Sequence, residues 1–510
     1  MSEEKMDYSK TLNLPKTNFQ MRAGLPEKEP KILEEVFEKQ HIYEKMLEKN
    51  KGKTPFVLHD GPPYANGEIH IGHALNKTLK DTIVRYKNLK GYWTPFIPGY
   101  DTHGMPTEKK AIQLLGLNRD EIPVNKFRDT CKKFTMDYKD KQTEGFKRLG
   151  VLADWDHPYI TYQPQMEAKQ IGVFADMYKK GYIYKGLKPV YWCTDCETAL
   201  AEAEIEYKNV NSNTAYVKFP VKDANGKFDE KNTFVVIWTT TPWTLPGNTG
   251  ITIGGDFDYS FVKIGEEVLI MASALVETVM KIAGIEEYEV VNEMKGAELE
   301  GVMCRHPFLD RDSKVVLGSP ETVDVSLDTG TGAVHTAPSY GKEDYLCGLK
   351  NGLDIIVCVD GKGHQTAEAG PFAGMYYAKS DKEIIKYLDE KGLLLASQVV
   401  NHSYPHCWRC KHPIIFRATS QWFASVDGFR KETLDAIKTV KWYPAWGEER
   451  ISKMVEERND WCISRQRTWG VPIPVFYCKD CEKEYVTEDS LKKVQDIFRE
   501  KGSNAWFEMS

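Results

Sequence analysis

The chain has 510 residues, of which 41% are hydrophobic and 28% are charged, and its formal net charge is −6 at pH 7. This length predicts more than one domain, and the negative charge argues against a uniformly basic nucleic-acid binder. The sequence has no run of about 18 uncharged apolar residues that could span a membrane, and no apolar secretory signal at its start. We therefore expect a cytoplasmic protein with no membrane partner.

The first hundred residues predict a helical extension followed by the start of a nucleotide-binding sheet. Apolar residues at helical spacing predict the extension over residues 1–50. A short apolar run at 55–59 predicts a buried strand, the Gly and Pro residues of 61–67 predict a turn, and a helix is expected to follow and to end at Gly91. One face of this helix carries four apolar residues spaced four apart: Ile71, Leu75, Leu79 and Ile83. Strand, turn and helix open a parallel nucleotide-binding sheet, whose next strand we place at 93–97.

The pattern of residue types in the sequence changes after about residue 200. Between 201 and 398 short β-branched runs recur, separated by Gly, Asn and Asp, which predicts a mostly β domain with a few helices. We interpret this domain as an insertion into the nucleotide-binding fold. That fold is predicted to occupy 51–200 and to resume over 399–475, and the start of a second small insertion, truncated at the chain end, is predicted at 476–510.

Six of the eleven cysteines form C-x-x-C pairs, which in a cytosolic chain indicate metal sites before disulfides. Cys193 and Cys196 lie just before the β region, and Cys407 and Cys410 lie just after it. Four converging thiolates make a tetrahedral structural zinc site, so we predict one Zn²⁺ that joins the two ends of the insertion. The alternative is two unrelated turns with free thiols.

His70 and His73 lie three residues apart in the first turn of the predicted helix, so their side chains face the same way. The helix N-terminus adds positive potential, and Gly72 allows close approach of a nucleotide. Such a site can stabilise the charge that develops when a carboxylate attacks an α-phosphate. Two histidines alone would more often be a metal pair or a core pair.

The loop before these histidines carries a family signature. Gly61-Pro-Pro-Tyr-Ala-Asn-Gly, followed by His70-Ile-Gly-His-Ala-Leu-Asn-Lys, resembles the ATP signature of class I aminoacyl-tRNA synthetases and, within that class, of the isoleucyl enzymes. Besides the histidines, the signature positions are Pro63, Tyr64, Ala65, Asn66, Gly67, Ile71 and Gly72. The stretch from Gly99 to Glu108 resembles a second family motif, from which it departs at Tyr100, Met105 and Thr107. The resemblance covers the whole chain and implies a mixed α/β fold: an incomplete class I synthetase Rossmann-type parallel nucleotide-binding fold with an inserted, mostly β editing domain.

The resemblance also implies roles for residues of the amino-acid site. His70 and His73 would contact the ATP phosphates. Asp101 would hold the α-ammonium of the amino acid in a charge-assisted pair, with the backbone of Gly61 and Pro62 nearby and His103 in the same motif. Trp469, in a segment that looks isoleucyl, would line the side-chain pocket. From residue type alone, the alternatives are a helix-capping aspartate and an ordinary core tryptophan.

A second site is implied in the β insertion. Isoleucine and valine differ by one methylene, and the discrimination that a pocket can draw from it, about 1–3 kcal/mol, has isoleucyl enzymes as its standard example. A hydrolytic site for the smaller product is therefore needed. In it Asp344 would hold the ammonium of a misattached valine and His335 would bound the pocket. Three hydroxyls would serve the ribose end of the tRNA and a water: those of Thr240, Thr241 and Thr244. Asn248 would support the loop. As bare residues, a threonine run is usually strand surface.

The resemblance implies an isoleucine–tRNA ligase that uses ATP with Mg²⁺, isoleucine and tRNA(Ile), that edits valyl-tRNA(Ile), and that we expect to be a monomer. Class I synthetases use a second catalytic loop resembling K-M-S-K-S, whose lysine meets the phosphates, and this sequence contains no such loop. We therefore expect this chain to lack that lysine and an anticodon-binding domain, and to keep editing. In the family the third pair, Cys478 and Cys481, belongs to a zinc site with downstream cysteines, so we expect an incomplete second site. A non-catalytic tRNA-binding or zinc-binding module is the alternative, and a fragment of a valyl enzyme fits the motifs less well.

Overall fold

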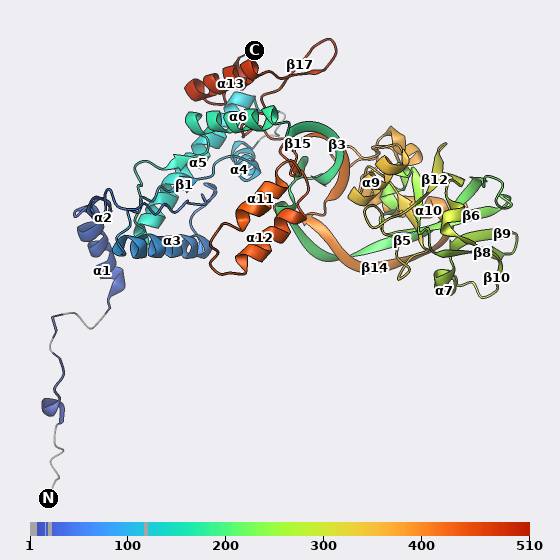
Figure 1. The fold of residues 1–510 in the computed structure, drawn as a ribbon, viewed down its shortest axis with the longest axis horizontal. Helices are drawn as coiled ribbons and strands as arrows, with labels where there is room; N and C mark the ends of the chain where they lie inside the picture. Colours follow the sequence, from blue (N-terminus) through green and yellow to red (C-terminus); the bar gives the residue numbers. More distant parts are fainter. Residues whose placement is uncertain (1–7, 16, 19–22, 117–120, 510) are drawn as a thin grey trace, which may run out of the picture. The chain divides into compact units, whose positions relative to one another are not determined.

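The structure is a computed structural model that describes residues 8–15, 17–18, 23–116 and 121–509 (Figure 1). Part of the predicted extension over residues 1–50 lies outside the described residues. The chain forms two compact units: unit 1 comprises Met1–Ile171, Thr468–Pro474 and Lys492–Ser510, and unit 2 comprises Gly172–Arg467 and Val475–Leu491. The predicted domain boundaries remain predictions.

Unit 1 is mainly helical. Its elements are η1 (Tyr8–Thr11), α1 (Leu25–Ile32), the π-helical η2 (Leu33–Glu38), α2 (Ile42–Lys49), α3 (Ile71–Leu89), β1 (Gly99–Tyr100), α4 (Met105–Leu115), α5 (Val124–Arg148), β2 (Tyr159–Ile160) and α14 (Ala505–Glu508), with parts of α6 (Pro164–Lys179) and α13 (Glu488–Lys501). Buried side chains of α6 and α13, among them Ile171 and Phe498, pack together. Segments from both ends of the sequence therefore build this unit.

Parallel pairing is present in unit 1, but it is short. β1 pairs with β2 in parallel over two residues, and single parallel bridges join Pro55 to Trp93 and Tyr64 to Asp101. The runs predicted as strands at 55–59 and 93–97 thus lie side by side without forming extended strands. Pro55 and Pro95 contribute to this, because proline has no N–H to donate to a sheet ladder.

The apolar face predicted for α3 is not buried in the structure. Ile71, Leu75, Leu79 and Ile83 expose 86%, 62%, 57% and 42% of their surfaces. The residues of α3 that are buried are instead Lys77, Val84 and Asn88. The face of α3 that packs into unit 1 is thus anchored largely by polar groups.

A ten-stranded sheet dominates unit 2, and all its strands come from residues 205–407. Its order is β10-β8-β9-β6-β13-β7-β12-β11-β5-β14, and an additional pairing of β5 with β6 closes six of these strands into a ring. The strands are β5 (Ile205–Asp223), β6 (Thr233–Thr239), β7 (Gly250–Ile253), β8 (Asp258–Ile264), β9 (Glu267–Ala272), β10 (Glu289–Lys295), β11 (Met303–Arg305), β12 (Asp312–Leu317), β13 (Ala333–Thr336) and β14 (Leu394–Cys407). Closure leaves few unpaired strand edges.

Helices and short turns complete the sheet domain. They are η4 (Glu202–Glu204), η5 (Pro242–Gly247), η6 (Ser273–Leu275), α7 (Val276–Ala283), α8 (Gly296–Leu299), α9 (Lys342–Asn351), η7 (Ala367–Phe372) and α10 (Tyr377–Glu390). Its core is one large cluster that includes fully buried Val217, Ile237, Leu245 and Leu269. Burial of each such side chain contributes about 1.5–3 kcal/mol to folding. The cluster also includes residues of the second sheet of unit 2, such as Trp192 and Phe423. The mixed α/β class predicted from the sequence is confirmed.

A second sheet in unit 2 has the order β16-β15-β3-β4. Its strands are β3 (Ile183–Cys193), β4 (Thr198–Leu200), β15 (Ile415–Ala424) and β16 (Trp461–Cys462), and the hairpin β17 (Phe476–Tyr477) and β18 (Glu484–Tyr485) and helices α11 (Arg430–Ile437) and α12 (Gly447–Glu456) lie nearby in sequence. The long strands β5 and β14 run antiparallel side by side, with Ile205 opposite Cys407 (Figure 1). The two ends of the ten-stranded sheet region therefore meet.

Across the residues that the structure describes, no helix is both long enough and apolar enough to span a bilayer.

Candidate functional site

The two signature loops of unit 1 lie side by side. The N–H of Asp101 donates to the carbonyl of Pro63, and the N–H of Ala65 donates to the carbonyl of Asp101, both at 2.8 Å. This backbone exchange fixes the 61–67 loop against the 99–104 loop. Residues that would hold a nucleotide and residues that would hold an amino acid are thereby brought together.

His70 and His73 stack at the N-terminus of α3, with ring centroids 3.8 Å apart. Nδ1 of His70 accepts the N–H of Gly72 at 3.1 Å and so caps the helix, and the N–H of His70 points to Nδ1 of His73 at 3.4 Å. A Cβ on Gly72 would come within 3.0 Å of the His70 ring, so glycine permits this capping. Burial, helped by the neighbouring His70 and Lys77, lowers the pKa of His73, which favours a neutral ring at pH 7 in the absence of an anion.

A buried aspartate under the 61–67 loop was not singled out from the sequence. The Asp60 carboxylate pairs with Lys77 through Oδ2 and with Lys80 through Oδ1 at 2.7 Å, and the N–H of Gly99 donates to Oδ2 at 2.9 Å. Asp60 therefore joins α3 to both signature loops. The spacing of Lys77 and Lys80 on α3 is the only sequence signal, and it is equally typical of a solvated helix face.

Gln142 of α5 is a second residue that sequence reasoning missed. Its side-chain amide donates to the carbonyls of Tyr64 and Gly67, at 2.9 Å and 2.8 Å, from a fully buried position. Asn66 and Gly67 of the predicted signature are half-buried in the turn that Gln142 holds. A rigid turn leaves Pro62 and its neighbours in place for a ligand.

Trp469 lies against the 99–104 loop, although 367 residues separate it from Thr102. Its indole N–H donates to the carbonyl of Thr102 at 2.6 Å, and its ring meets that of His103 at a centroid distance of 5.0 Å. Burial raises the pKa of Asp101, against the opposing effect of His103 and of neighbouring N–H groups. A half-buried carboxylate that is costly to ionise alone is suited to an ammonium partner.

Predicted residues of the second site that lie far apart in the sequence meet in unit 2. Asn248 donates from its amide nitrogen to the Gly250 carbonyl at 2.8 Å and to Nδ1 of His335 at 2.8 Å, and Nε2 of His335 lies 2.9 Å from the Thr244 hydroxyl. The Gly250 carbonyl fixes the orientation of the Asn248 amide, so His335 carries its proton on Nε2 and donates it to Thr244. Burial lowers the pKa of His335 to about 3. His335 is therefore a neutral hydrogen-bond donor and not a base.

Of the remaining predicted residues of this site, Thr240 and Thr241 follow β6, and Asp344 lies in α9. The Thr241 and Thr244 hydroxyl oxygens are 3.4 Å apart, and Thr240 is half-buried at the end of β6. Asp344, in the first turn of α9, accepts the N–H of Ala337 at 2.9 Å. Burial, which outweighs this hydrogen bond, raises the pKa of Asp344 to about 7.

The backbone of Trp243 in η5 is hydrogen-bonded by two residues that no sequence motif indicated. The Asp381 carboxylate accepts its N–H at 2.7 Å, and the Gln365 amide donates to its carbonyl at 2.9 Å. These contacts fix the turn that carries Thr241 and Thr244.

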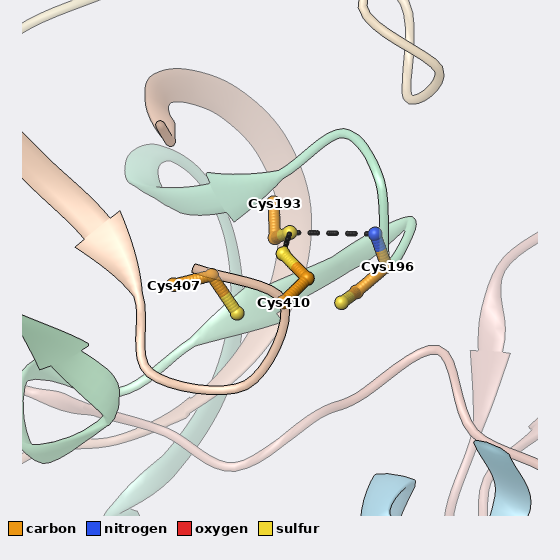
Figure 2. Close-up of side chains that lie close together, drawn as sticks. All are labelled: Cys193, Cys196, Cys407 and Cys410. Carbon is orange, nitrogen blue, oxygen red and sulfur yellow. Dashed lines mark hydrogen bonds between the residues drawn. The ribbon is translucent and has the colours of Figure 1, made fainter. Parts of the chain in front are cut away.

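Four cysteines form a compact cluster at the junction of the two sheets of unit 2 (Figure 2). The sulfur atoms of Cys193, Cys196, Cys407 and Cys410 all lie within 4.8 Å of one another. Cys193 and Cys407 are the last residues of β3 and β14, and Cys196 and Cys410 lie in the turns that follow. Four soft ligands at this separation fit the donor set of a tetrahedral Zn²⁺ site.

Cys478 and Cys481 lie on the exposed turn of the β17–β18 hairpin. Within the described part of the chain, the possible metal-binding groups of three or more residues do not include them.

Comparisons with known proteins agree on one family. Residues 32–510 match the tRNA synthetases class I (I, L, M and V). An isoleucine–tRNA ligase of Moorella thermoacetica is 56% identical over 502 residues, which are 98% of this chain and 53% of that protein, and one of Thermoanaerobacter sp. strain X514 is 56% identical over 510 residues, 99% of this chain and 54% of that protein. The chain thus spans about half the length of the curated relatives it matches.

Among solved structures, the ternary complex of Agrobacterium radiobacter K84 agnB2 LeuRS with tRNA and LeuAMS is 18% identical and covers 90% of this chain and 52% of its own. The TM-score is 0.36, which is too low to carry a structural argument.

Proposed function

The chain belongs to the class I tRNA synthetases of the I, L, M and V group, and from this membership we propose that it is part of an isoleucine–tRNA ligase. Such an enzyme uses ATP with Mg²⁺ to convert isoleucine to isoleucyl-adenylate and transfers the isoleucyl group to tRNA(Ile). The relatives named above, which are isoleucine–tRNA ligases, support this choice within the group.

The observation that carries the activation proposal is the convergence of the two signature loops with Trp469. In the proposed site Asp101 pairs with the α-ammonium, and the indole of Trp469 packs against the isoleucine side chain. The carboxylate of isoleucine then faces the α-phosphate of ATP, and His70 and His73 at the positive end of α3 bind phosphate oxygens. The Asp101–Pro63 hydrogen bond supports this assignment because it makes both subsites parts of one framework.

For unit 2 we propose hydrolysis of valyl-tRNA(Ile). The contacts of His335 with Thr244 and with Asn248 support it, because these two residues lie 91 and 87 positions before His335 in the sequence. Asp344 in its ionised form would bind the ammonium of the valyl group. Thr241 and Thr240 offer hydroxyls to the ribose end and to the attacking water, while neutral His335 sets the orientation of Thr244 and bounds the pocket.

We propose that Cys193, Cys196, Cys407 and Cys410 hold one structural Zn²⁺. When bound, the ion would neutralise four thiolates and tie the turn after β3 to the turn after β14. It has no part in the proposed reactions.

Hydrolysis of valyl-tRNA(Ile) by the chain tests the editing proposal. We expect deacylation well above the rate in buffer, and we expect Asp344→Ala to abolish it, because the ammonium loses its only charged partner in the proposed site. Asp389→Ala, which changes an exposed aspartate of α10, is the matched control and should act like the parent. No hydrolysis by a folded parent chain would contradict editing and favour a non-catalytic tRNA-binding or zinc-binding module.

A further inference from the structure

Arg128 is a charged residue that neither signature accounts for. It lies in the second turn of α5, and only 1% of its surface is exposed. Its guanidinium donates to four groups within unit 1: the carbonyls of Thr468 at 2.5 Å and Gly470 at 3.0 Å, the Asn504 side chain at 2.6 Å and the Ser503 hydroxyl at 2.5 Å. Burying a cation at this depth is costly unless hydrogen bonds and an opposite charge compensate for the water it loses.

Two of these contacts bracket Trp469. The carbonyls that Arg128 holds belong to the residues directly before and after the tryptophan, and both are bound by the same guanidinium nitrogen. The guanidinium carbon also lies 5.3 Å from the centre of the Trp469 ring. Arg128 thus contacts the backbone on either side of the tryptophan and the indole itself.

The rest of the Trp469 surroundings is equally constrained. One carboxylate oxygen of Glu108 accepts the N–H groups of Thr468 and Trp469, both at 2.7 Å, and Thr102 accepts the indole N–H. Glu108 thus holds the N–H groups of the segment, Arg128 holds its flanking carbonyls, and the N–H of Gly104 holds the Trp469 carbonyl at 3.0 Å. Loss of Arg128 would release the two flanking carbonyls.

A chain of polar contacts links Arg128 to His103 of the second family motif. The Ser503 hydroxyl, which Arg128 contacts, donates to Glu167 at 2.6 Å, and Glu167 lies 3.3 Å from Nε2 of His103. Burial disfavours the Glu167 carboxylate, but the neighbouring His103 and hydrogen bonds from Ser503 leave its pKa below the usual range, so it is ionised and balances the guanidinium. The network therefore runs from the backbone around Trp469 to the His103 side chain, whose ring contacts the indole.

We propose that Arg128 is the positioning residue that sets the depth of the isoleucine side-chain pocket. By fixing the backbone around Trp469 it fixes where the indole wall stands, and hence how strongly the site prefers isoleucine over valine. This inference rests on the proposed function, because it takes Trp469 to be the pocket wall. It goes beyond that function by naming the residue that controls the wall from outside the pocket.

Lysine is the informative replacement, because it keeps the charge but cannot donate to two carbonyls, a hydroxyl and an amide in one plane. Equilibrium dialysis of the chain with free isoleucine and free valine measures the preference. We expect Arg128→Lys to weaken isoleucine binding by about tenfold and valine binding by less, so that the preference falls by about threefold. Arg148→Lys is the matched control on the same helix, because Arg148 forms an exposed pair with Glu29, and it should leave both affinities unchanged.

A second measurement follows Trp469 without a ligand. In chain labelled with 5-fluorotryptophan, the fluorine resonance that disappears in Trp469→Phe belongs to this residue. We expect that resonance to shift or broaden in Arg128→Lys and to stay in place in Arg148→Lys. Arg128→Met, which also removes the charge, should show the larger effect, unless it fails to fold.

The outcomes separate a positioning role of Arg128 from a merely structural one, and both from a wrong substrate. If the parent prefers isoleucine but Arg128→Lys weakens both amino acids equally, or leaves the Trp469 resonance unmoved, Arg128 is a structural residue only and the inference is wrong. If the folded parent chain binds neither amino acid, the proposed substrate is wrong and the role in the pocket is rejected with it. A reduced preference together with a displaced resonance supports the inference.

Discussion

Burial shifts the pKa of two residues of the proposed editing site in opposite directions. It lowers the pKa of His335 to about 3 and raises the pKa of Asp344 to about 7, so that each is pushed toward its neutral form. At pH 7 His335 is therefore uncharged, while Asp344 is about half ionised. An arriving ammonium would complete the ionisation of Asp344, because an opposite charge lowers the pKa of a carboxyl group.

The first prediction is a pH dependence. Because only ionised Asp344 can hold the valyl ammonium, we expect deacylation to be lost as the pH falls through the folded-state pKa. At subsaturating substrate the rate, corrected for spontaneous hydrolysis, should rise about tenfold from pH 6 to pH 8. Asp344→Asn should remove the activity and, since the raised pKa means that the charge destabilises the fold, should melt at a higher temperature than the parent at pH 8. A flat pH profile for the parent would contradict the assignment.

The second prediction concerns the buried pair of Asp60 and Lys77. Both side chains are almost fully buried, so Lys77→Met leaves a carboxylate with Lys80 as its only cation. We expect a loss of about 3 kcal/mol in the free energy of unfolding of unit 1, seen as a fall of about 6–12 °C in its melting temperature. Lys90→Met, at the exposed end of α3, should change little. Restoration of part of the loss by Asp60→Asn in the Lys77→Met background would show that the unpaired charge is the cause.

At the scale of elements, α3 illustrates how sequence pattern and packing can disagree. A spacing of four residues correctly predicts a helix, and it groups Ile71, Leu75 and Leu79 on one face, but spacing alone does not say which face is buried. In the structure the buried face of α3 is held by the Asp60–Lys77 pair and by Asn88, whose amide donates to the Met46 carbonyl at 3.1 Å. Long-range polar partners of this kind leave no periodic trace in the sequence.

The third prediction follows from the exposed side of α3. A stripe of large apolar side chains in water promotes association, so we expect Leu75→Glu and Leu79→Glu to reduce self-association in light scattering. Their effect on stability should stay within about 0.5 kcal/mol, as for other surface substitutions. Thr78→Glu adds the same charge to an exposed position without removing apolar surface and serves as the control. A large fall in melting temperature for Leu75→Glu would mean that this face is buried after all.

The candidate sites differ in how far the sequence could predict them. The stacking of His70 on His73 follows from their spacing at a helix start, and the cysteine cluster follows from two C-x-x-C pairs, because both depend on local geometry. The placement of Trp469 beside Thr102 could be expected only from a family resemblance, since nothing in the residues links positions so far apart. Gln142 and Arg128 could not be predicted at all, because a single polar residue in a long helix carries no pattern.

At the scale of the whole molecule, the chain's stabilising features divide between the two units. The four-cysteine cluster and the ten-stranded sheet belong to unit 2, whereas the Asp60–Lys77 pair belongs to unit 1. The fourth prediction is therefore that scanning calorimetry resolves two transitions. A zinc chelator, or Cys410→Ser, should lower one of them, and Lys77→Met should lower the other. A chelator that shifts both equally, or neither, would contradict this division.

The hydrogen bond from Trp469 to Thr102 also has a consequence during protein synthesis. The two residues are 367 positions apart, and a ribosome adds about 5–20 residues per second. Thr102 and His103 therefore leave the ribosome roughly 20–70 s before the tryptophan that covers them. Over that interval residues 205–407 can fold around their own core, and the pairing of Ile205 with Cys407 then shortens the loop that remains to be closed. Thr102 and Trp469, which the proposed amino-acid pocket brings together, are therefore synthesised at well-separated times.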